Sequence, residues 1–235
     1  MIRFRDVRFG YREGMAVIDG ANLEIGPGLT LLLGPNGSGK STLLRLAAGV
    51  ERPDAGQVTI GGHDLWVDEV ASRMELAYVP EQPDLTPYAT LEEILRLVCR
   101  LRGEPAAAGR ESLEAVGLLG LGRRSVRELS MGQRRRAVLA AAMIGRPRVL
   151  LLDEPLEAMD RVIRGTILSW VERARLAGAT VVVAGHETEP FETTASRALA
   201  VVGGKPRVVD GLPSSAAERA AILDSLARGE GGAAG

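Results

Sequence analysis

The chain has 235 residues, of which 46% are apolar and 25% are charged, and its formal net charge is −1. These proportions are ordinary for a globular protein of one large domain, or of a domain with a sizeable insertion. The balanced charge gives no sign of general nucleic-acid binding. The single cysteine, Cys99, excludes an intramolecular disulfide and fits a reducing compartment.

Neither a signal-peptide core nor a membrane span is visible in the sequence. The N-terminus, Met1-Ile2-Arg3-Phe4-Arg5-Asp6, has no apolar core. The richest apolar runs, at 138–145 and 181–185, fall far short of the roughly 20 apolar residues of a membrane helix. We therefore expect a protein that is soluble by itself.

The first third of the chain carries mostly strand and turn signals. Residues 2–9 alternate as a strand, and residues 15–25 form an apolar stretch broken by Asp19-Gly20. Further on, the pattern predicts a buried strand at 29–33, a helix at 41–49, a turn at 52–56, a strand at 57–60 before the Gly61-Gly62 turn, and a strand at 75–80.

Residues 90–146 change to helical spacing. Apolar residues recur at helical intervals from Leu91 onward, and Thr90 with Glu93 makes a capping-box start. We expect an all-helical insertion, at about 83–145, inside an α/β frame. Its second and third helices are predicted at about 106–116 and 131–145.

The second half of the chain returns to buried strands. Residues 148–152 and 180–184 are continuous apolar runs, which imply a parallel sheet covered on both faces. We expect an α/β fold with a central, mostly parallel sheet, an N-terminal antiparallel β subdomain and the helical insertion. It would form a single domain over 1–228, with a flexible tail over 229–235. The other predicted elements are a helix at 159–177, a strand pair at 197–202 and 206–209, and a last helix at 214–228.

A glycine-rich stretch joins the strand at 29–33 to the helix that follows it. This is the context that a phosphate-binding loop requires. Glycines allow positive φ and close approach of the backbone, so that successive N–H groups and the positive end of a helix face an anion. Lys40 would reach the terminal phosphates, and the Ser41 hydroxyl would hold Mg²⁺. The stretch consists of Gly34, Pro35, Asn36, Gly37, Ser38, Gly39, Lys40, Ser41 and Thr42.

The alternative is a turn that fits this motif by composition, in a chain with 29 glycines. Lysine usage argues against that alternative. Among the 29 basic residues only Lys40 and Lys205 are lysines. A compact, strongly hydrated ammonium suits a phosphate cradle better than a planar guanidinium. We therefore interpret the stretch as a nucleotide site.

Two carboxylates follow the strand at 148–152. Asp153 and Glu154 stand at the carboxyl end of a buried strand, where ligands bind in open α/β sheets. Because successive side chains diverge, one would organise Mg²⁺ and its water, and the other would polarise an attacking water as general base. The structural alternative is an Asp-Glu-Pro sequence that merely begins a turn.

One histidine and one tyrosine are further candidates. His186 follows the strand at 180–184, and this position at the same sheet edge favours contact with a transferring phosphate over a capping or solvent-facing role. His63, in a glycine turn, is interpreted as solvent-facing. Tyr11 lies in a link after Gly10, where a turn aromatic is the simpler interpretation.

The third helix of the insertion opens with Leu129-Ser130-Met131-Gly132-Gln133. Ser130 is a good N-cap, which is the structural explanation. The functional explanation is a helix N-terminus whose Ser and Gly N–H groups bind a second anion. Since this helix lies on the insertion, away from the chain's own phosphate loop, it would complete a site only when two copies face each other.

With these motifs the chain resembles the ATP-binding cassette (ABC) family, the nucleotide-binding subunits of ABC transporters, over about residues 2–210. Walker A alone is shared by many NTPases, but a signature sequence between a Q-loop and Walker B is specific to this family. The matches are 34–42 for Walker A, 149–155 for Walker B, Gln82 for the Q-loop, 129–133 for the signature, Asp160 for the D-loop, His186 for the switch histidine and Tyr11 for the aromatic that stacks on adenine.

The resemblance implies an ATPase that works as a head-to-tail pair. Two ATP molecules would be sandwiched between Walker A of one cassette and Ser130, Gly132 and Gln133 of the other. The remaining roles that it implies are Glu154 as general base, His186 and Lys40 at the γ-phosphate, Ser41, Gln82 and Asp153 at Mg²⁺, and Asp160 beside the nucleotide at the dimer contact.

The resemblance also implies partners. The insertion at about 83–145 would contact a separate integral-membrane subunit, which places the cassette at the cytoplasmic face of a membrane. The second cassette would be another copy of this chain, and no nucleic-acid partner is expected. The compact size, with no sizeable domain after residue 210, resembles the exporter-type stand-alone ATPases.

Two other classes of function are weighed against this one. Soluble ABC ATPases acting on DNA or the ribosome usually show paired cassettes, long coiled-coil insertions or a basic surface, and the sequence shows none of these. A P-loop kinase would need an acceptor-binding region and no signature helix.

Two stretches depart from the family pattern. Met131 stands where many members have Gly, so it keeps the backbone N–H but adds bulk, and we expect function to be retained with an effect on turnover. Gly132, the position of closer approach, is kept. The stretch 156–159 before Asp160 is less glycine-rich or serine-like than usual, which affects the detail of the dimer contact rather than the assignment.

Overall fold

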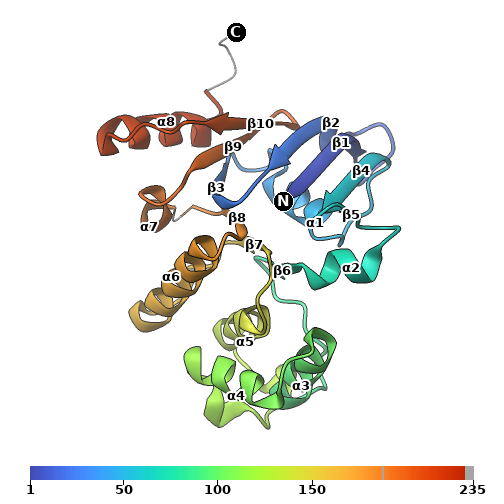
Figure 1. Ribbon diagram of the computed structural model, residues 1–235, viewed down its shortest axis with the longest axis vertical. Coiled ribbons are helices and arrows are strands. Elements are labelled where there is room, and N and C mark those ends of the chain that lie inside the picture. The colour runs from blue at the N-terminus through green and yellow to red at the C-terminus, as the bar shows by residue number, and fades with distance from the viewer. Residues whose placement is uncertain (187, 231–235) are drawn as a thin grey trace.

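Two β-sheets and a lobe of helices make up the protein (Figure 1). The computed structural model describes residues 1–186 and 188–230. The predicted tail at 229–235 therefore falls mostly outside the described residues. Gly229 itself is the C-cap of the last helix, with the positive φ of 77° that favours glycine there.

The larger sheet has six strands in the order β10-β9-β3-β8-β7-β6. All neighbours pair in parallel except β10, which forms an antiparallel hairpin with β9. The predicted central, mostly parallel sheet is thus confirmed. Its strands are β3 (Gly28–Leu33), β6 (Leu76–Val79), β7 (Val149–Asp153), β8 (Thr180–Ala184), β9 (Arg197–Val202) and β10 (Lys205–Asp210).

The smaller sheet is antiparallel, in the order β2-β1-β4-β5. Strand β2 runs through Asp19-Gly20, where the sequence predicted an interruption. Gly20 adopts φ 67°, and the register between β1 and β2 shifts nearby, so the strand bulges instead of ending. The strands are β1 (Ile2–Phe9), β2 (Ile18–Ile25), β4 (Ala55–Ile60) and β5 (His63–Asp64).

Three helices between β6 and β7 form a lobe at the bottom of Figure 1: α3 (Leu91–Arg102), α4 (Ala106–Ala115) and α5 (Met131–Met143). Two helices, α2 (Glu69–Met74) and α7 (Glu189–Glu192), were not predicted, because so few residues show no helical period. No helix of the described residues is long and apolar enough to cross a membrane. The others are α1 (Lys40–Ala47), α6 (Arg161–Leu176) and α8 (Ala216–Arg228).

Polar caps set where two of the helices begin. Thr90 and Glu93 form the predicted capping box of α3: the Glu93 N–H donates to Thr90 Oγ1 at 3.3 Å, and the Thr90 N–H donates to Glu93 Oε2 at 2.8 Å. Helix α6 begins later than predicted because Asp160 is its N-cap. The Asp160 carboxylate accepts the N–H groups of Val162 and Ile163, both at 3.0 Å.

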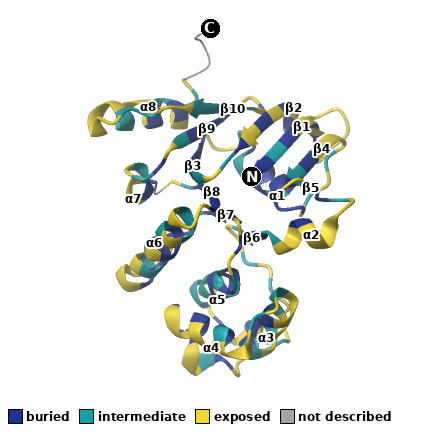
Figure 2. Cartoon of the chain, in the orientation of Figure 1, coloured by how far each residue is buried: buried dark blue, intermediate teal, exposed yellow. Residues whose placement is uncertain are grey.

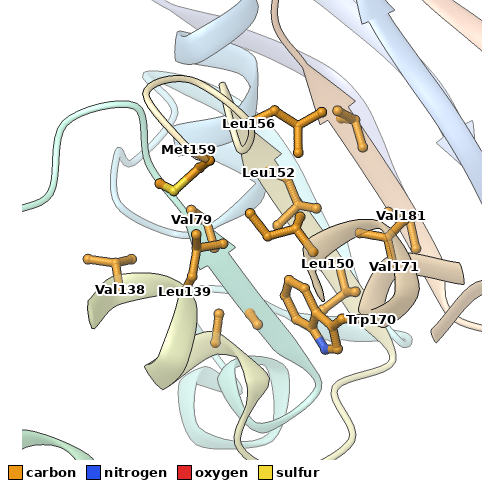
Figure 3. Packing of buried hydrophobic residues seen from close by; sticks show 14 of the residues in the cluster. Val79, Val138, Leu139, Leu150, Leu152, Leu156, Met159, Trp170, Val171 and Val181 are labelled. Atoms are coloured by element: carbon orange, nitrogen blue, oxygen red, sulfur yellow. The ribbon is translucent and has the colours of Figure 1, made fainter. Parts of the chain in front are cut away.

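The larger sheet separates two hydrophobic cores. In β3, Leu31 belongs to the core on the side of the helical lobe, and the adjacent Leu32 belongs to the core shared with α1 and the smaller sheet. This alternation follows from the period of two in a strand. Figure 2 shows buried residues along the strands and exposed residues on the outer faces of the helices. In Figure 3, Leu150 of β7 lies beside Trp170 of α6, and Leu152 belongs to the same core.

Candidate active site

The loop between β3 and α1 has the backbone shape that its glycines predict. Gly34, Gly37 and Gly39 adopt φ 145°, 77° and 108°, which side chains rarely tolerate. At Gly34 a Cβ would also collide with the carbonyl oxygen of Val201 in β9 and lie 2.8 Å from Ser38 Oγ. Backbone and neighbouring strand therefore both require glycine at this position, and the loop is fixed against the sheet edge.

Lys40 is the first residue of α1, and its ammonium turns back over the loop. Its Nζ donates to the carbonyl oxygens of Gly34 at 2.7 Å and Pro35 at 3.2 Å. Burial lowers the pKa of Lys40, while the carboxylates of Asp153 and Glu154 act in the opposite direction. The amine is thus held by carbonyl oxygens beside two carboxylates. It also lies at the N-terminus of a helix, and a cation at this position suits an anionic ligand.

A cleft of 670 Å³ brings most of the predicted site residues together. It is open to solvent and lies where the loop, the carboxyl end of β7 and the residues after β8 meet. The cleft is lined by Tyr11, Val17, Asn36, Gly37, Gly39, Lys40, Ser41, Thr42, Glu81, Asp153, Glu154, Glu157 and His186. Gly34 and Pro35 lie on the other side of the loop, where they line a neighbouring cavity of 530 Å³ together with Lys40, His186 and residues of α8.

Asp153 is the last residue of β7, and only 5% of its surface is exposed. Burial raises the pKa of Asp153, and interaction with the Ser41 hydroxyl lowers it. A carboxylate and a hydroxyl side by side are hard oxygen ligands that fit Mg²⁺. No group of three or more His, Cys, Asp or Glu side chains among the described residues could hold a metal.

Glu154 leaves the strand in a turn and is clamped from the neighbouring strand. Its φ of 50° is unusual for a residue with a side chain. The backbone N–H of His186 donates to both carboxylate oxygens at 3.1 Å. Burial raises the pKa of Glu154, and the bond from His186 lowers it. The result is a half-buried carboxylate held by backbone, which can accept a proton.

His186 lies at the edge of the cleft with 70% of its side chain exposed. Its Nε2 is 3.7 Å from Glu154 Oε1. The ring is therefore exposed to solvent beside the Glu154 carboxylate, and its contact with a phosphate stays a prediction. His63 is exposed in β5, on the other sheet, as the interpretation of a turn histidine requires.

Tyr11 lies at the end of the cleft near Thr42, with 52% of its surface exposed. Its ring packs edge-on against Phe9, with centroids 4.9 Å apart and an interplanar angle of 86°. Its hydroxyl lies 3.4 Å from Thr42 Oγ1 and accepts a bond from Arg45 at 3.2 Å. The ring is thus held at both ends, whereas its sequence position suggested a simple turn aromatic.

Gln82 does not line the cleft. It is exposed in the segment after β6, and the adjacent Glu81 lines the cleft instead. Glu81 and Glu157 were not predicted as site residues. An acidic residue next to each motif was visible in the sequence, but only the path of the backbone decides which neighbour faces the cleft.

The residues of the predicted second anion site lie on the helical lobe and do not line the cleft. Ser130 and Gln133 cap α5 reciprocally: the Gln133 N–H donates to Ser130 Oγ at 3.3 Å, and the Ser130 N–H donates to Gln133 Oε1 at 2.9 Å. A Cβ at Gly132 would meet nothing within 4 Å, so this chain alone gives no steric reason for glycine there. Met131 is 57% exposed.

An ion pair connects α5 to the segment after Glu154. Arg135 NH1 lies 2.8 Å from Glu157 Oε2 and also donates to the Glu157 carbonyl oxygen at 3.3 Å. This segment includes Ala158, whose φ is 59°. The helical lobe is thus attached to the cleft through a residue that lines it.

Comparison with known proteins identifies the family. The family described as ABC transporter matches residues 18–157, more than half of the chain. The chain belongs to the ABC transporter family. It is an ABC-type ATPase, and both the fold class and the family predicted from the sequence are confirmed.

Curated relatives are ATP-binding proteins of transport systems. The cassette is 34% identical over 210 residues to the L-cystine transport system ATP-binding protein TcyN of Escherichia coli strain K12, and the match covers 82% of this chain and 83% of that protein. It is 37% identical over 190 residues to the sulfate/thiosulfate import ATP-binding protein CysA of Synechocystis, which covers 78% of this chain. The chain spans only 53% of the length of CysA.

Solved structures share the architecture. A dimeric bacterial ABC transporter cassette, MJ0796, is 25% identical with a TM-score of 0.78, covering 89% of this chain and 98% of that one. The same cassette as a dimer in a post-hydrolysis state, bound to ADP and Pi, is 26% identical with a TM-score of 0.77 and the same coverage. An ATP-binding subunit of an ABC transporter has a TM-score of 0.83 at 24% identity, which compares the fold alone.

Proposed function

We propose that this cassette is the energy-coupling subunit of a membrane transporter and that two copies, head to tail, complete each other's ATP sites. One observation carries the proposal. The cleft gathers the phosphate loop, two differently held carboxylates and a histidine, whereas the capped N-terminus of α5 lies outside it. A second copy would supply that helix end.

In this proposal the triphosphate lies along the loop between β3 and α1. Backbone N–H groups of the loop and the N-terminus of α1 bind phosphate oxygens, and Lys40 exchanges its carbonyl partners for the terminal phosphates. The Ser41 hydroxyl and the Asp153 carboxylate would hold Mg²⁺, which when bound neutralises charge on the phosphates. Tyr11 stacks on the base.

Glu154 acts as the general base in this scheme. Its carboxylate is oriented by the two bonds from the His186 N–H, and its raised pKa favours acceptance of a proton from the attacking water. The imidazole of His186 contacts the γ-phosphate. Gln82 lies beyond the cleft in this chain, so its role at Mg²⁺ and at the partner surface depends on movement of the segment after β6.

The second copy supplies Ser130, Gly132 and Gln133 to the phosphates from the far side, and Asp160 lies at the same contact. The exposure of Ser130 and the room at Gly132 support this arrangement, because this end of α5 can be approached from outside the chain. The dimeric MJ0796 cassettes support it as solved examples of pairing in a related chain.

The membrane partner is a separate integral-membrane subunit that binds the helical insertion at about 83–145, which places the cassette at the cytoplasmic face. Transport systems in the names of the curated relatives support this partner. The exporter-type prediction rested on compact size. Two curated relatives whose names state a direction, CysA and the Fe(3+) ions import ATP-binding protein FbpC of Streptomyces coelicolor, are importers, which weighs against it.

The base assignment is tested with Glu154→Gln, which keeps the shape and one of the two oxygens that accept the His186 N–H, but cannot accept the proton. We expect MgATP to bind with unchanged affinity, turnover to fall by roughly two orders of magnitude or more, and an ATP-bound dimer to accumulate in size-exclusion chromatography. Lys40→Ala is the matched variant and should weaken binding itself. Hydrolysis at the parent rate by Glu154→Gln would overturn the assignment.

The transport assignment is tested by purification of the tagged chain from its own cell. Recovery of a stoichiometric integral-membrane subunit supports transport. Removal of the helical insertion should then abolish recovery of this subunit. Recovery of ribosomes or DNA in its place would support the soluble alternative and contradict the proposal.

A further inference from the structure

Arg45 contacts the tip of Tyr11, which lines the cleft. It lies on α1, one turn after the phosphate loop, and its NH1 donates to the Tyr11 hydroxyl at 3.2 Å. The hydroxyl of Tyr11 is then left to donate to Thr42 Oγ1, at 3.4 Å. Tyr11 is thereby attached to α1 through its tip.

The other side of Arg45 faces the sheet. Its guanidinium also interacts with the hydroxyl of Tyr78 in β6. Burial, together with the charge of Asp153, raises the pKa of Tyr78 to about 12, so this hydroxyl stays protonated. Arg45 is therefore a cation held between two tyrosine hydroxyls, of which only that of Tyr11 belongs to an exposed ring.

Without Arg45 little would fix the tip of Tyr11. The ring has 52% of its surface exposed, and its root is fixed by edge-on contact with Phe9. An exposed side chain that must be immobilised on binding costs about 0.5–1.5 kcal/mol, which corresponds to roughly a twofold to tenfold loss of affinity. Holding the ring in place beforehand removes that cost.

We propose that Arg45 is a positioning residue for the nucleotide base, acting by fixing the Tyr11 ring at the end of the cleft. The inference rests on the proposed function, in which Tyr11 stacks on the base. It goes further by assigning base affinity to a residue outside the phosphate loop. Arg45 touches neither base nor phosphate in this role and acts on the base through Tyr11.

The test compares a ligand that has a base with one that lacks it. Binding of MgATP and of magnesium tripolyphosphate is measured by calorimetry for the full-length chain, for Arg45→Met and for Tyr11→Phe. We expect each variant to weaken MgATP roughly twofold to tenfold and to leave tripolyphosphate unchanged, and the double variant to be no weaker than either single one. Arg45→Lys, which keeps a donor, should restore part of the loss.

Arg207→Met serves as the control, because Arg207 is an exposed arginine of β10 that does not line the cleft. Steady-state kinetics should show a raised KM for ATP with kcat within about twofold for Arg45→Met, as expected for a loss of uniform binding. Equal weakening of both ligands, additive losses in the double variant, or unchanged MgATP affinity would overturn the inference. Failure of the parent chain to bind MgATP at all would instead overturn the proposed function.

Discussion

Gly185 leaves the space in which the Glu154 carboxylate lies. A Cβ at Gly185 would stand 2.8 Å from Glu154 Oε2, and the next residue, His186, supplies the N–H that binds both carboxylate oxygens. The strand end of β8 thus positions the proposed base through backbone alone. A substitution here tests the position of the carboxylate without changing its chemistry.

We predict that Gly185→Ala lowers kcat by about 10- to 100-fold, because displacement of a catalytic group by about 1 Å has costs of this order. The atom in the way is the end of a side chain that can move, so the free energy of unfolding should change little. ATPase kinetics and urea unfolding check both parts. Gly165→Ala is the control, since a Cβ there meets nothing within 4 Å in α6. An unchanged kcat in Gly185→Ala would show that the carboxylate tolerates displacement.

At the scale of elements, two helices of the lobe start with the same device. Thr90 and Ser130 are both N-caps with a reciprocal partner three residues later. The structural contribution of the two caps should therefore be similar. In the proposed function only Ser130 also binds the nucleotide of the partner. Comparison of the two residues therefore distinguishes capping from ligand binding.

We predict that Thr90→Ala and Ser130→Ala each reduce the free energy of unfolding by about 1 kcal/mol, through loss of the cap bond. Only Ser130→Ala should also weaken formation of the ATP-bound dimer in the Glu154→Gln background. Urea unfolding gives the first quantity, and size-exclusion chromatography with ATP gives the second. Equal effects of both variants on the dimer would show that Ser130 acts as a capping residue and does not bind the nucleotide.

At the scale of the whole molecule, the sheet holds two cores together through adjacent residues. Leu31 and Leu32 are both fully buried, yet they belong to different cores on opposite faces of β3. The phosphate loop leaves the end of this strand. Its position therefore depends on packing against the helical lobe on one side and against α1 with the smaller sheet on the other.

We predict that Leu31→Ala and Leu32→Ala each lower the free energy of unfolding by about 2–5 kcal/mol, the range for a buried leucine truncated to leave a cavity. Leu97→Ala is the matched control, because Leu97 of α3 is 48% exposed and its loss should cost about 0.5 kcal/mol or less. Urea unfolding compares the three variants. A small loss in only one of the two buried variants would mean that the corresponding core contributes little to β3.

The sequence by itself determined the local features. The continuous apolar runs of the central strands and the capping residues Thr90 and Ser130 act through neighbours a few residues away, and the loop glycines supply positive φ angles by themselves. For that reason most strands and long helices lie where they were predicted. The short helices α2 and α7, and the strand that bulges at Gly20 instead of ending, lack such a local signal.

Only the tertiary structure decided which side chains meet. The clamp of the His186 N–H on Glu154 joins residues 32 apart, and the bond from Arg45 to Tyr11 joins residues 34 apart. Such contacts depend on the strand order and on single backbone angles, such as φ 50° at Glu154. The same reason places Glu81, rather than Gln82, in the cleft. Burial of apolar surface over the whole chain determines the strand order, and no short stretch of sequence contains that information.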